Sequence, residues 1–231
     1  MKNGVSICIV TLDSFFYNRL ALEMIRRFTH LVQYEVLVFD GGSKDGSREW
    51  LGEQGDVKLV GGKENIGHGK ALDVLIKCAQ YNVCCTLCSD AFPTSHEWLV
   101  PAFSLFDGKT MLAGADKGWG RLLKHYICPS YLMGQTEFLR QHSFDHNWPK
   151  WDTGEMVSKK VEEMGGQFKF IEMKYDDFGG KFKPKPCNYS GLVWHKWFST
   201  RIKVYDVSHE CEPEYHNFVI KWLRDRYSLT F

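Results

Sequence analysis

Acidic and hydroxyl side chains are interleaved with glycines in the segment VLVFDGGSKDGSREWL, residues 36–51. Its first four residues are β-prone, and a strand that ends at Asp40 presents this carboxylate at the carboxyl edge of a sheet, where open α/β folds bind ligands. Gly42 lets the chain turn sharply and lets a ligand approach the backbone. Ser43 and Asp45 can accept hydrogen bonds from the unpaired N–H groups that begin the next helix. The segment predicts a nucleotide pocket in which an acidic side chain binds a base or ribose.

This segment does not have the composition of a phosphate-binding loop. No Lys or Arg follows its glycines at the Walker spacing, and the chain contains no GxGxxG. An ordinary strand-to-helix turn of an α/β domain is the alternative interpretation of this stretch on its own. The choice between a nucleotide pocket and an ordinary turn therefore depends on the residues found at the ends of the other strands.

Composition and charge exclude several classes of protein. The 231 residues suffice for one large α/β domain, and a net charge of +1 argues against a nucleic-acid binder. No apolar run approaches the roughly 20 residues that span a bilayer, and the first residues resemble a core strand more than a signal peptide. The eight cysteines lie mostly in apolar segments, Cys84, Cys85 and Cys88 among them. We expect reduced structural thiols in a cytoplasmic protein, and neither a disulfide framework nor a zinc knuckle.

The apolar periodicity alternates between strand and helix in the first half of the chain, which implies a parallel sheet with helices on its faces. The expected strands cover residues 5–10, 35–39, 57–60 and 83–88, and the expected helices 17–31, 46–52 and 67–81. The second half is less regular, with strands expected at 109–114, 131–134 and 168–173 and helices at 152–165 and 214–226. No linker is evident, so we expect one domain.

Four motifs follow strand ends in order: VTLD at 10–13, DGGSKDGS at 40–47, ENIGHGKALD at 64–73 and SDA at 89–91. Their order and spacing resemble the family 2 glycosyltransferases, closely over residues 5–100 and loosely beyond. The resemblance implies a single GT-A (Rossmann-like) α/β domain over residues 1–231, with a mixed, mostly parallel central sheet flanked by helices. Residues 1–100 would form the nucleotide-sugar-binding half and residues 101–231 the acceptor-binding half.

The resemblance also implies which residues bind the donor. Thr11 and Asp13 would flank the nucleobase, Asp40 would bind the base or ribose, and the segment around Asn65 would lie near the ribose and pyrophosphate. Asp13 stands where the family usually has Asn, an isosteric change that alters donor capacity. The full set of expected nucleotide-sugar-binding residues is Thr11, Asp13, Asp40, Gly42, Ser43, Asn65, Gly67, Lys70, Ser89, Asp90 and Arg201.

The fourth strand end corresponds to the family's D-x-D metal site. Here the residues are Cys88, Ser89 and Asp90, so only the second acid is present. Asp90 would hold Mn²⁺ or Mg²⁺ together with the donor's phosphate oxygens. A late histidine followed by arginine contacts the metal or diphosphate in several members, and His195 and Arg201 match it. The structural alternatives are that Asp90 caps the following turn and that His195 packs in the core.

An inverting transfer needs a carboxylate that removes the proton from the acceptor hydroxyl. The segment WDTGE, residues 151–155, matches the family's acceptor-side acidic motif. Asp152 is the favoured base and Glu155 the second candidate. The same spacing also forms a capping box at a helix start, which would explain both residues without catalysis.

The expected function is that of an inverting glycosyltransferase in polysaccharide biosynthesis, which moves a sugar from a nucleotide-diphosphate donor to a glycan or lipid-linked acceptor hydroxyl. UDP is the favoured nucleotide, with GDP and dTDP as the others. A non-catalytic nucleotide-sugar or glycan-binding protein on a degenerate GT-A scaffold is the alternative from another class. The C-terminal helix, expected at 214–226, could also rest on a membrane surface, although core packing is the favoured explanation of its apolar face.

Overall fold

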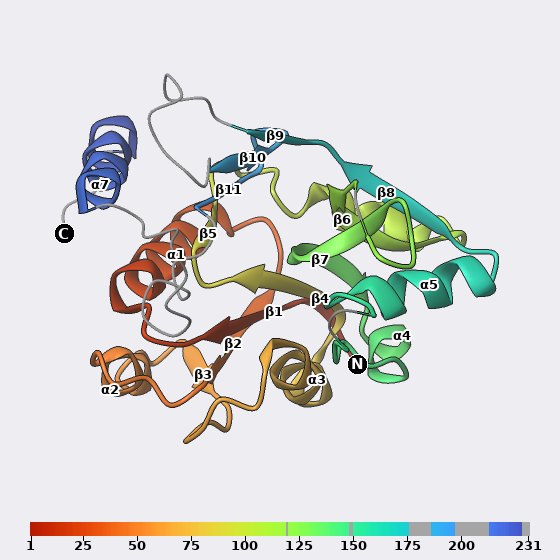
Figure 1. The fold of residues 1–231 in the computed structure, drawn as a ribbon, viewed down its shortest axis with the longest axis horizontal. Coiled ribbons are helices and arrows are strands. Elements are labelled where there is room, and N and C mark those ends of the chain that lie inside the picture. The colour runs from red at the N-terminus through yellow and green to blue at the C-terminus, as the bar shows by residue number, and fades with distance from the viewer. Residues whose placement is uncertain (119, 148–149, 176–185, 197–212, 228–231) are drawn as a thin grey trace.

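The computed structural model describes residues 1–118, 120–147, 150–175, 186–196 and 213–227 (Figure 1). A seven-stranded sheet forms its centre, in the order β3-β2-β1-β4-β7-β6-β8. Its strands are β1 (Lys2–Thr11), β2 (Tyr34–Asp40), β3 (Val57–Leu59), β4 (Tyr81–Cys88), β6 (Thr110–Lys117), β7 (Tyr126–Gln135) and β8 (Gln167–Ile171). All of the pairings are parallel except those of β7 with β4 and with β6. The expected mixed, mostly parallel sheet is therefore confirmed.

Helices cover both faces of this sheet (Figure 1). One face packs against α1 (Phe15–Phe28), α2 (Ser47–Gly52) and the 3-10 helix η1 (Val100–Phe106). The other packs against α3 (His68–Cys78), α4 (Thr136–Arg140) and α5 (Glu155–Glu163). Because β1, β2 and β4 are buried from both sides, they are nearly continuous apolar runs instead of alternating ones.

A second, smaller sheet joins the middle of the chain to a late segment. Its four strands are ordered β5-β11-β10-β9 and pair antiparallel, with β5 at Ala91–Pro93, β9 at Met173–Tyr175, β10 at Cys187–Tyr189 and β11 at Val193–His195. His195 pairs with Ala91, directly after the end of β4. This sheet therefore carries residues from around position 190 to the carboxyl edge of the central sheet.

The α1 helix uses two apolar stripes. Leu22 and Ile25 face the central sheet, whereas Leu20 and Met24 pack with Trp194 of β11. The last described helix, α7 (Pro213–Tyr227), adds Leu223 to that second cluster, so its buried face is accounted for by packing.

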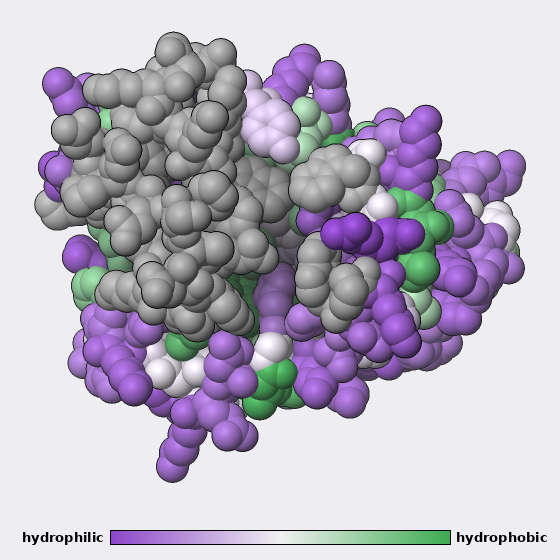
Figure 2. Space-filling model, in the orientation of Figure 1, coloured by the Kyte–Doolittle hydropathy of each residue, from purple (hydrophilic) through white to green (hydrophobic). Residues whose placement is uncertain are grey.

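The surface of the described residues in this orientation is largely hydrophilic, with small separate hydrophobic patches (Figure 2). The cysteines in the described part of the chain form no disulfide with one another. Within the same residues, no helix combines the length and the apolar character needed to cross a bilayer.

Gly62 is a position at which the fold requires glycine. Its φ is +76°, and an added Cβ would lie 1.5 Å from the carbonyl oxygen of Asp40. We expect Gly62→Ala to lower the free energy of unfolding by about 3 kcal/mol or more, because backbone must move to admit the methyl group. Gly52→Ala is the matched control. Gly52 is the last residue of α2, and a Cβ added there would meet open space. This variant should raise the free energy of unfolding by about 0.5–1 kcal/mol. Chemical denaturation of both variants measures this, and equal stability would contradict the close approach.

Candidate active site

The loops that follow β1 and β2 are tied together by hydrogen bonds between side chain and backbone. The backbone N–H of Asp13 donates to Ser43 Oγ at 2.8 Å, and the N–H of Lys44 donates to Asp13 Oδ1 at 2.7 Å. Gly41 N–H donates to the carbonyl of Thr11 at 2.8 Å. Asp13 has a φ of +46°, a left-handed conformation that this pair of bonds holds in place. The two loops therefore behave as one unit.

Asp45 completes this connection by binding the first N–H group of two helices. Its Oδ2 accepts from Phe15 of α1 at 2.9 Å, and its Oδ1 accepts from Ser47 of α2 at 3.0 Å. Partial burial acts to raise the pKa of Asp45, but the hydrogen bonds from Ser47 and Phe15 outweigh it and lower the pKa. A carboxylate at two helix N-termini also interacts favourably with both helix dipoles.

Asp40 is fully buried and shapes the loop that follows it. Its Oδ2 accepts from the N–H groups of Gly42 and Ser43, each at 3.1 Å, and its Oδ1 accepts from Ser43 Oγ. Arg48 of α2 lies 3.5 Å from the same carboxylate and also donates to the carbonyl of Gly62. Arg48 was not anticipated from the sequence, although an arginine in the first turn of the helix after an acidic strand end can reach back to it.

Thr11, the last residue of β1, is paired with Asp40 in the sheet and is almost fully buried. Among the residues that the structure describes, its Oγ1 has no hydrogen-bond partner. A buried hydroxyl without a partner is costly, so this atom is an unsatisfied polar group at the carboxyl end of β1.

The ENIGHGKALD segment packs against the glycines of the first loop. An added Cβ on Gly42 would lie 2.6 Å from the carbonyl oxygen of Lys63, so the two backbones are in close contact. Asn65 accepts the N–H of Gly67 at 2.9 Å, which shapes the turn into α3. Lys70 is exposed, and its Nζ lies 3.9 Å from Asp145.

Cys88, Asp90 and His195 meet at the end of β4. One ligand atom from each residue, the thiol sulfur, a carboxylate oxygen and an imidazole nitrogen, lies within 4.8 Å of the others. His195 Nε2 is 3.2 Å from Asp90 Oδ1, and His195 Nδ1 is 2.7 Å from the Tyr189 hydroxyl. Ser89, between the first two, is buried. The predicted pair Asp90 and His195 is thus adjacent, and Cys88, expected to be only structural, lies beside it.

Asp152 lies in a polar environment provided by the second half of the chain. Its Oδ2 accepts from Lys117 Nζ at 2.7 Å and from the Tyr126 hydroxyl at 3.0 Å, and its Oδ1 accepts the N–H of Thr153 at 2.8 Å. Burial acts to raise the pKa of Asp152, but the bond and charge of Lys117 lead the effects that lower it overall. Asp152 is therefore a carboxylate at neutral pH.

Glu155 differs from Asp152 in its surroundings. It is fully buried at the first position of α5, after an N-cap at Gly154. One carboxylate oxygen accepts from the N–H groups of Leu122 and Leu123, and the other accepts from that of Asp152 at 2.9 Å. Glu155 therefore ties the loop at Leu122 and Leu123 to the start of α5. The N-cap of α5 is Gly154, without a side-chain cap bond, so the capping box expected with Asp152 as N-cap is not formed.

The pKa of His68, at the start of α3, responds to its burial and to the charges of Asp152 and Asp90. Burial lowers the pKa of His68 to about 4; the negative charge of Asp152 opposes this, His146 adds to it and Asp90 opposes it. The imidazole is therefore neutral at pH 7 and lies within electrostatic reach of Asp90 and Asp152. Lys117 also acts on the pKa of Cys88. The β4 end and the Asp152 region are therefore close enough for their charges to act on each other's neighbours. Arg201, also predicted, lies outside the described residues.

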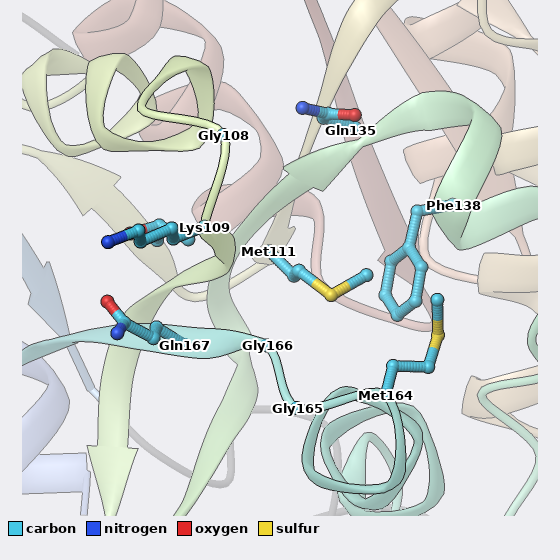
Figure 3. Close-up of a pocket in the computed structure, with 10 residues that line it drawn as sticks. Gly108, Lys109, Met111, Gln135, Phe138, Met164, Gly165, Gly166 and Gln167 are labelled. Carbon is cyan, nitrogen blue, oxygen red and sulfur yellow. The ribbon is translucent and has the colours of Figure 1, made fainter.

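A separate pocket of about 550 Å³ opens at the opposite edge of the central sheet, where β6 and β8 begin and β7 ends. The side chains of Met111, Phe138 and Met164 point toward one another in it (Figure 3). It contains none of the residues predicted to bind a donor, so its position argues against a role in the reaction.

The family described as glycosyl transferase family 2 matches residues 6–114. A mannosyltransferase from Pyrobaculum calidifontis, solved with GDP-Man and Mn²⁺, has a TM-score of 0.61 and 18% identity over 74% of this chain and 55% of its own. Glucosyl-3-phosphoglycerate synthase from Mycobacterium tuberculosis, solved with Mn²⁺, UDP and glucosyl-3-phosphoglycerate, has a TM-score of 0.56 and 13% identity over 74% of this chain and 70% of its own. At these identities the likeness concerns the fold, and the chain spans about half the length of the mannosyltransferase. No curated protein sequence matches the chain.

The double cap formed by Asp45 makes a stability prediction. Asp45→Ala removes the acceptor for the first N–H of α1 and of α2, so we expect a loss of about 2–3 kcal/mol at pH 7. Because the folded protein lowers the pKa of Asp45, this stabilisation is present above its ordinary value of 3.8 and is lost as the pH falls through the lowered value. Denaturant titrations at pH 7 and at pH 3 measure the difference from wild type, which should narrow at the lower pH.

Glu53→Gln, an exposed change at the other end of α2, is the control and should stay within about 0.5 kcal/mol of wild type. A loss for Asp45→Ala no larger than this would show that the two bonds contribute little.

Proposed function

Since residues 6–114 match glycosyl transferase family 2 and the chain shares the GT-A fold of solved glycosyltransferases, we propose that it is an inverting glycosyltransferase. In this proposal it moves a sugar from a nucleotide-diphosphate donor, with UDP favoured, to the hydroxyl of a glycan or lipid-linked acceptor. Residues 1–100 bind the donor and residues 101–231 bind the acceptor within a single domain.

The observation that carries the proposal is the rigid pair of loops at the carboxyl ends of β1 and β2. The buried Asp40 fixes the second loop from inside, and Asp13 and Ser43 join it to the first. The Thr11 hydroxyl remains buried without a partner among the described residues. A nucleobase or ribose placed there gives that hydroxyl a partner and meets a surface that needs little reorganisation on binding.

The residues at the end of β4 fit a divalent cation. A buried carboxylate and an imidazole lie 3.2 Å apart, and the other nitrogen of that imidazole is bonded to Tyr189, as is usual for a metal-binding histidine. Asp90 and His195 would hold the ion. When bound, the ion would supply charge that offsets the departing nucleotide diphosphate.

Asp152 is the proposed general base. Lys117 and Tyr126 fix the position of its carboxylate, and its lowered pKa keeps it ionised and able to take the proton of the acceptor hydroxyl. The same lowered pKa makes it a weak base, so the proton moves only as the new glycosidic bond forms. Glu155 has its oxygens engaged by three backbone N–H groups and acts in this proposal as support for the site.

Nucleotide binding tests the proposal first. We expect UDP to raise the melting temperature more than GDP or dTDP, and to do so more strongly with Mn²⁺, because a ligand that binds the folded state stabilises it according to its concentration over Kd. Thr11→Val keeps the shape of the side chain and removes the hydroxyl, so it should weaken this stabilisation. Thr29→Val, a matched change at a buried threonine bonded to Trp98, should not alter the response to nucleotide. Stabilisation by none of the three nucleotides would favour a degenerate scaffold.

The two carboxylates of the WDTGE segment can be separated by kinetics and stability. Asp152→Asn should fold normally, keep nucleotide binding and lower kcat by at least about 100-fold, because the base is lost. Glu155→Gln should instead lower the free energy of unfolding by about 1–3 kcal/mol, because one buried N–H then faces an amide group that cannot accept it. Release of nucleoside diphosphate from a panel of sugar donors and acceptors gives the rates. The assignment of the base is wrong if Asp152→Asn retains full kcat.

A further inference from the structure

We infer that Cys88 is itself a metal ligand, and that Cys88, Asp90 and His195 form a site that selects Zn²⁺ over Mg²⁺ and Mn²⁺. The inference rests on the proposed function only in that the donor diphosphate would complete the coordination of the same ion. The starting point is the fourth strand end, where Cys88 occupies the position of the first carboxylate in the D-x-D motif described above.

The three donor atoms come from positions that the sheets fix. Cys88 is the last residue of β4 and pairs with Val10 of β1. Asp90 follows in the turn to β5, and its carbonyl accepts the N–H of Lys196 at 3.0 Å. That bond and the pairing of His195 with Ala91 hold the imidazole against the turn. The site is therefore built on strand ends and not on a long loop, which favours a defined geometry.

The spacing suits a small tetrahedral ion. Sulfur, oxygen and nitrogen ligands at about 2.0–2.3 Å from zinc lie roughly 3.3–3.8 Å from one another. The distance between Asp90 and His195 is already 3.2 Å, and the whole group lies within 4.8 Å. Small side-chain rotations bring the Cys88 sulfur into range.

The hydrogen bond to one nitrogen of His195 determines which nitrogen is left to bind a metal. Nδ1 is bonded to the Tyr189 hydroxyl, which in turn lies 2.8 Å from Ser130 Oγ. The Tyr189 ring stacks on Tyr131, with ring centroids 5.8 Å apart, so the hydroxyl is held in place. With Nδ1 occupied, Nε2 is directed at Asp90, in the arrangement common among histidine ligands.

The donor set decides the choice of metal. Mg²⁺ and Mn²⁺ prefer carboxylate, carbonyl and water oxygens, whereas thiolate and imidazole favour zinc. Three protein ligands with one position left open are typical of catalytic zinc sites. A phosphate oxygen of the donor can take the open position. The single exchange of oxygen for sulfur at residue 88 thus changes which cation the same strand ends hold.

Cobalt reports on the thiolate directly. We expect Co²⁺, added to the protein with UDP, to give near-ultraviolet charge-transfer absorption from a sulfur ligand, and Zn²⁺ to displace it. Cys88→Ser should abolish that absorption and weaken Zn²⁺ binding by at least about tenfold. Cys88→Asp should also lose the absorption but bind Mn²⁺ more tightly than wild type. Cys78→Ser, on α3, and Cys128→Ser, a buried thiol nearby, should both retain it.

The spectrum of the wild-type protein needs no variant to fold, so its result is decisive. Absence of the sulfur-to-cobalt absorption, or its persistence in Cys88→Ser, overturns the inference. Stabilisation by UDP, measured on the same samples, separates the two proposals. If UDP stabilises the protein but no sulfur band appears, the glycosyltransferase proposal stands and the cysteine ligand does not. If the sulfur band appears but no nucleotide stabilises the protein, the cysteine ligand stands and the glycosyltransferase proposal does not.

Discussion

The carboxylate of Asp45 is the constraint on which the loops after β1 and β2 depend. It accepts the first N–H of α1 and of α2, and two helices that begin on one side chain cannot shift independently. The loops that lead into these helices are the ones that carry Asp13 and Ser43, so their mutual bonds form between fixed ends. Hydrogen bonds to a partly buried carboxylate favour its ionised form, and here the same bonds fix the geometry of the two loops.

The second sheet imposes a different constraint, because it determines which residues can share a site. His195 lies 3.2 Å from Asp90 only because β11 pairs with β5. The surroundings of Asp152 depend in a similar way on the central sheet, where β6 supplies Lys117 and β7 supplies Tyr126 to its carboxylate. The regular first half thus provides the loops that we propose to bind the donor, and the later strands bring further polar groups to the same edge of the sheet.

Much of the fold could be predicted from sequence because its main elements have strong local signals. Apolar runs indicated β1, β2 and β4, and spaced apolar residues indicated α1 and α3, with errors confined to their ends. The three-residue strands β5, β10 and β11 carry no periodic signal, so the second sheet was missed. Lys117 and His68 act on partners distant in sequence, which no spacing rule reveals. The sequence predicts a structural Cys88 because it shares an apolar strand with Cys84 and Cys85 and no second CxxC pair completes a zinc site; the structure places its sulfur beside Asp90 and His195.

The charge balance of the site explains why a cation matters there. A donor diphosphate brings several negative charges to a region that already holds Asp40, Asp90 and Asp152. Arg48 is paired with Asp40, and Lys117 is paired with Asp152, so the positive charge of each is largely used within the protein. Asp90 faces a histidine, which carries charge only when protonated. An ion bound at the end of β4 would therefore be the strongest local source of positive charge, and its identity would follow from the ligand atoms at residues 88, 90 and 195.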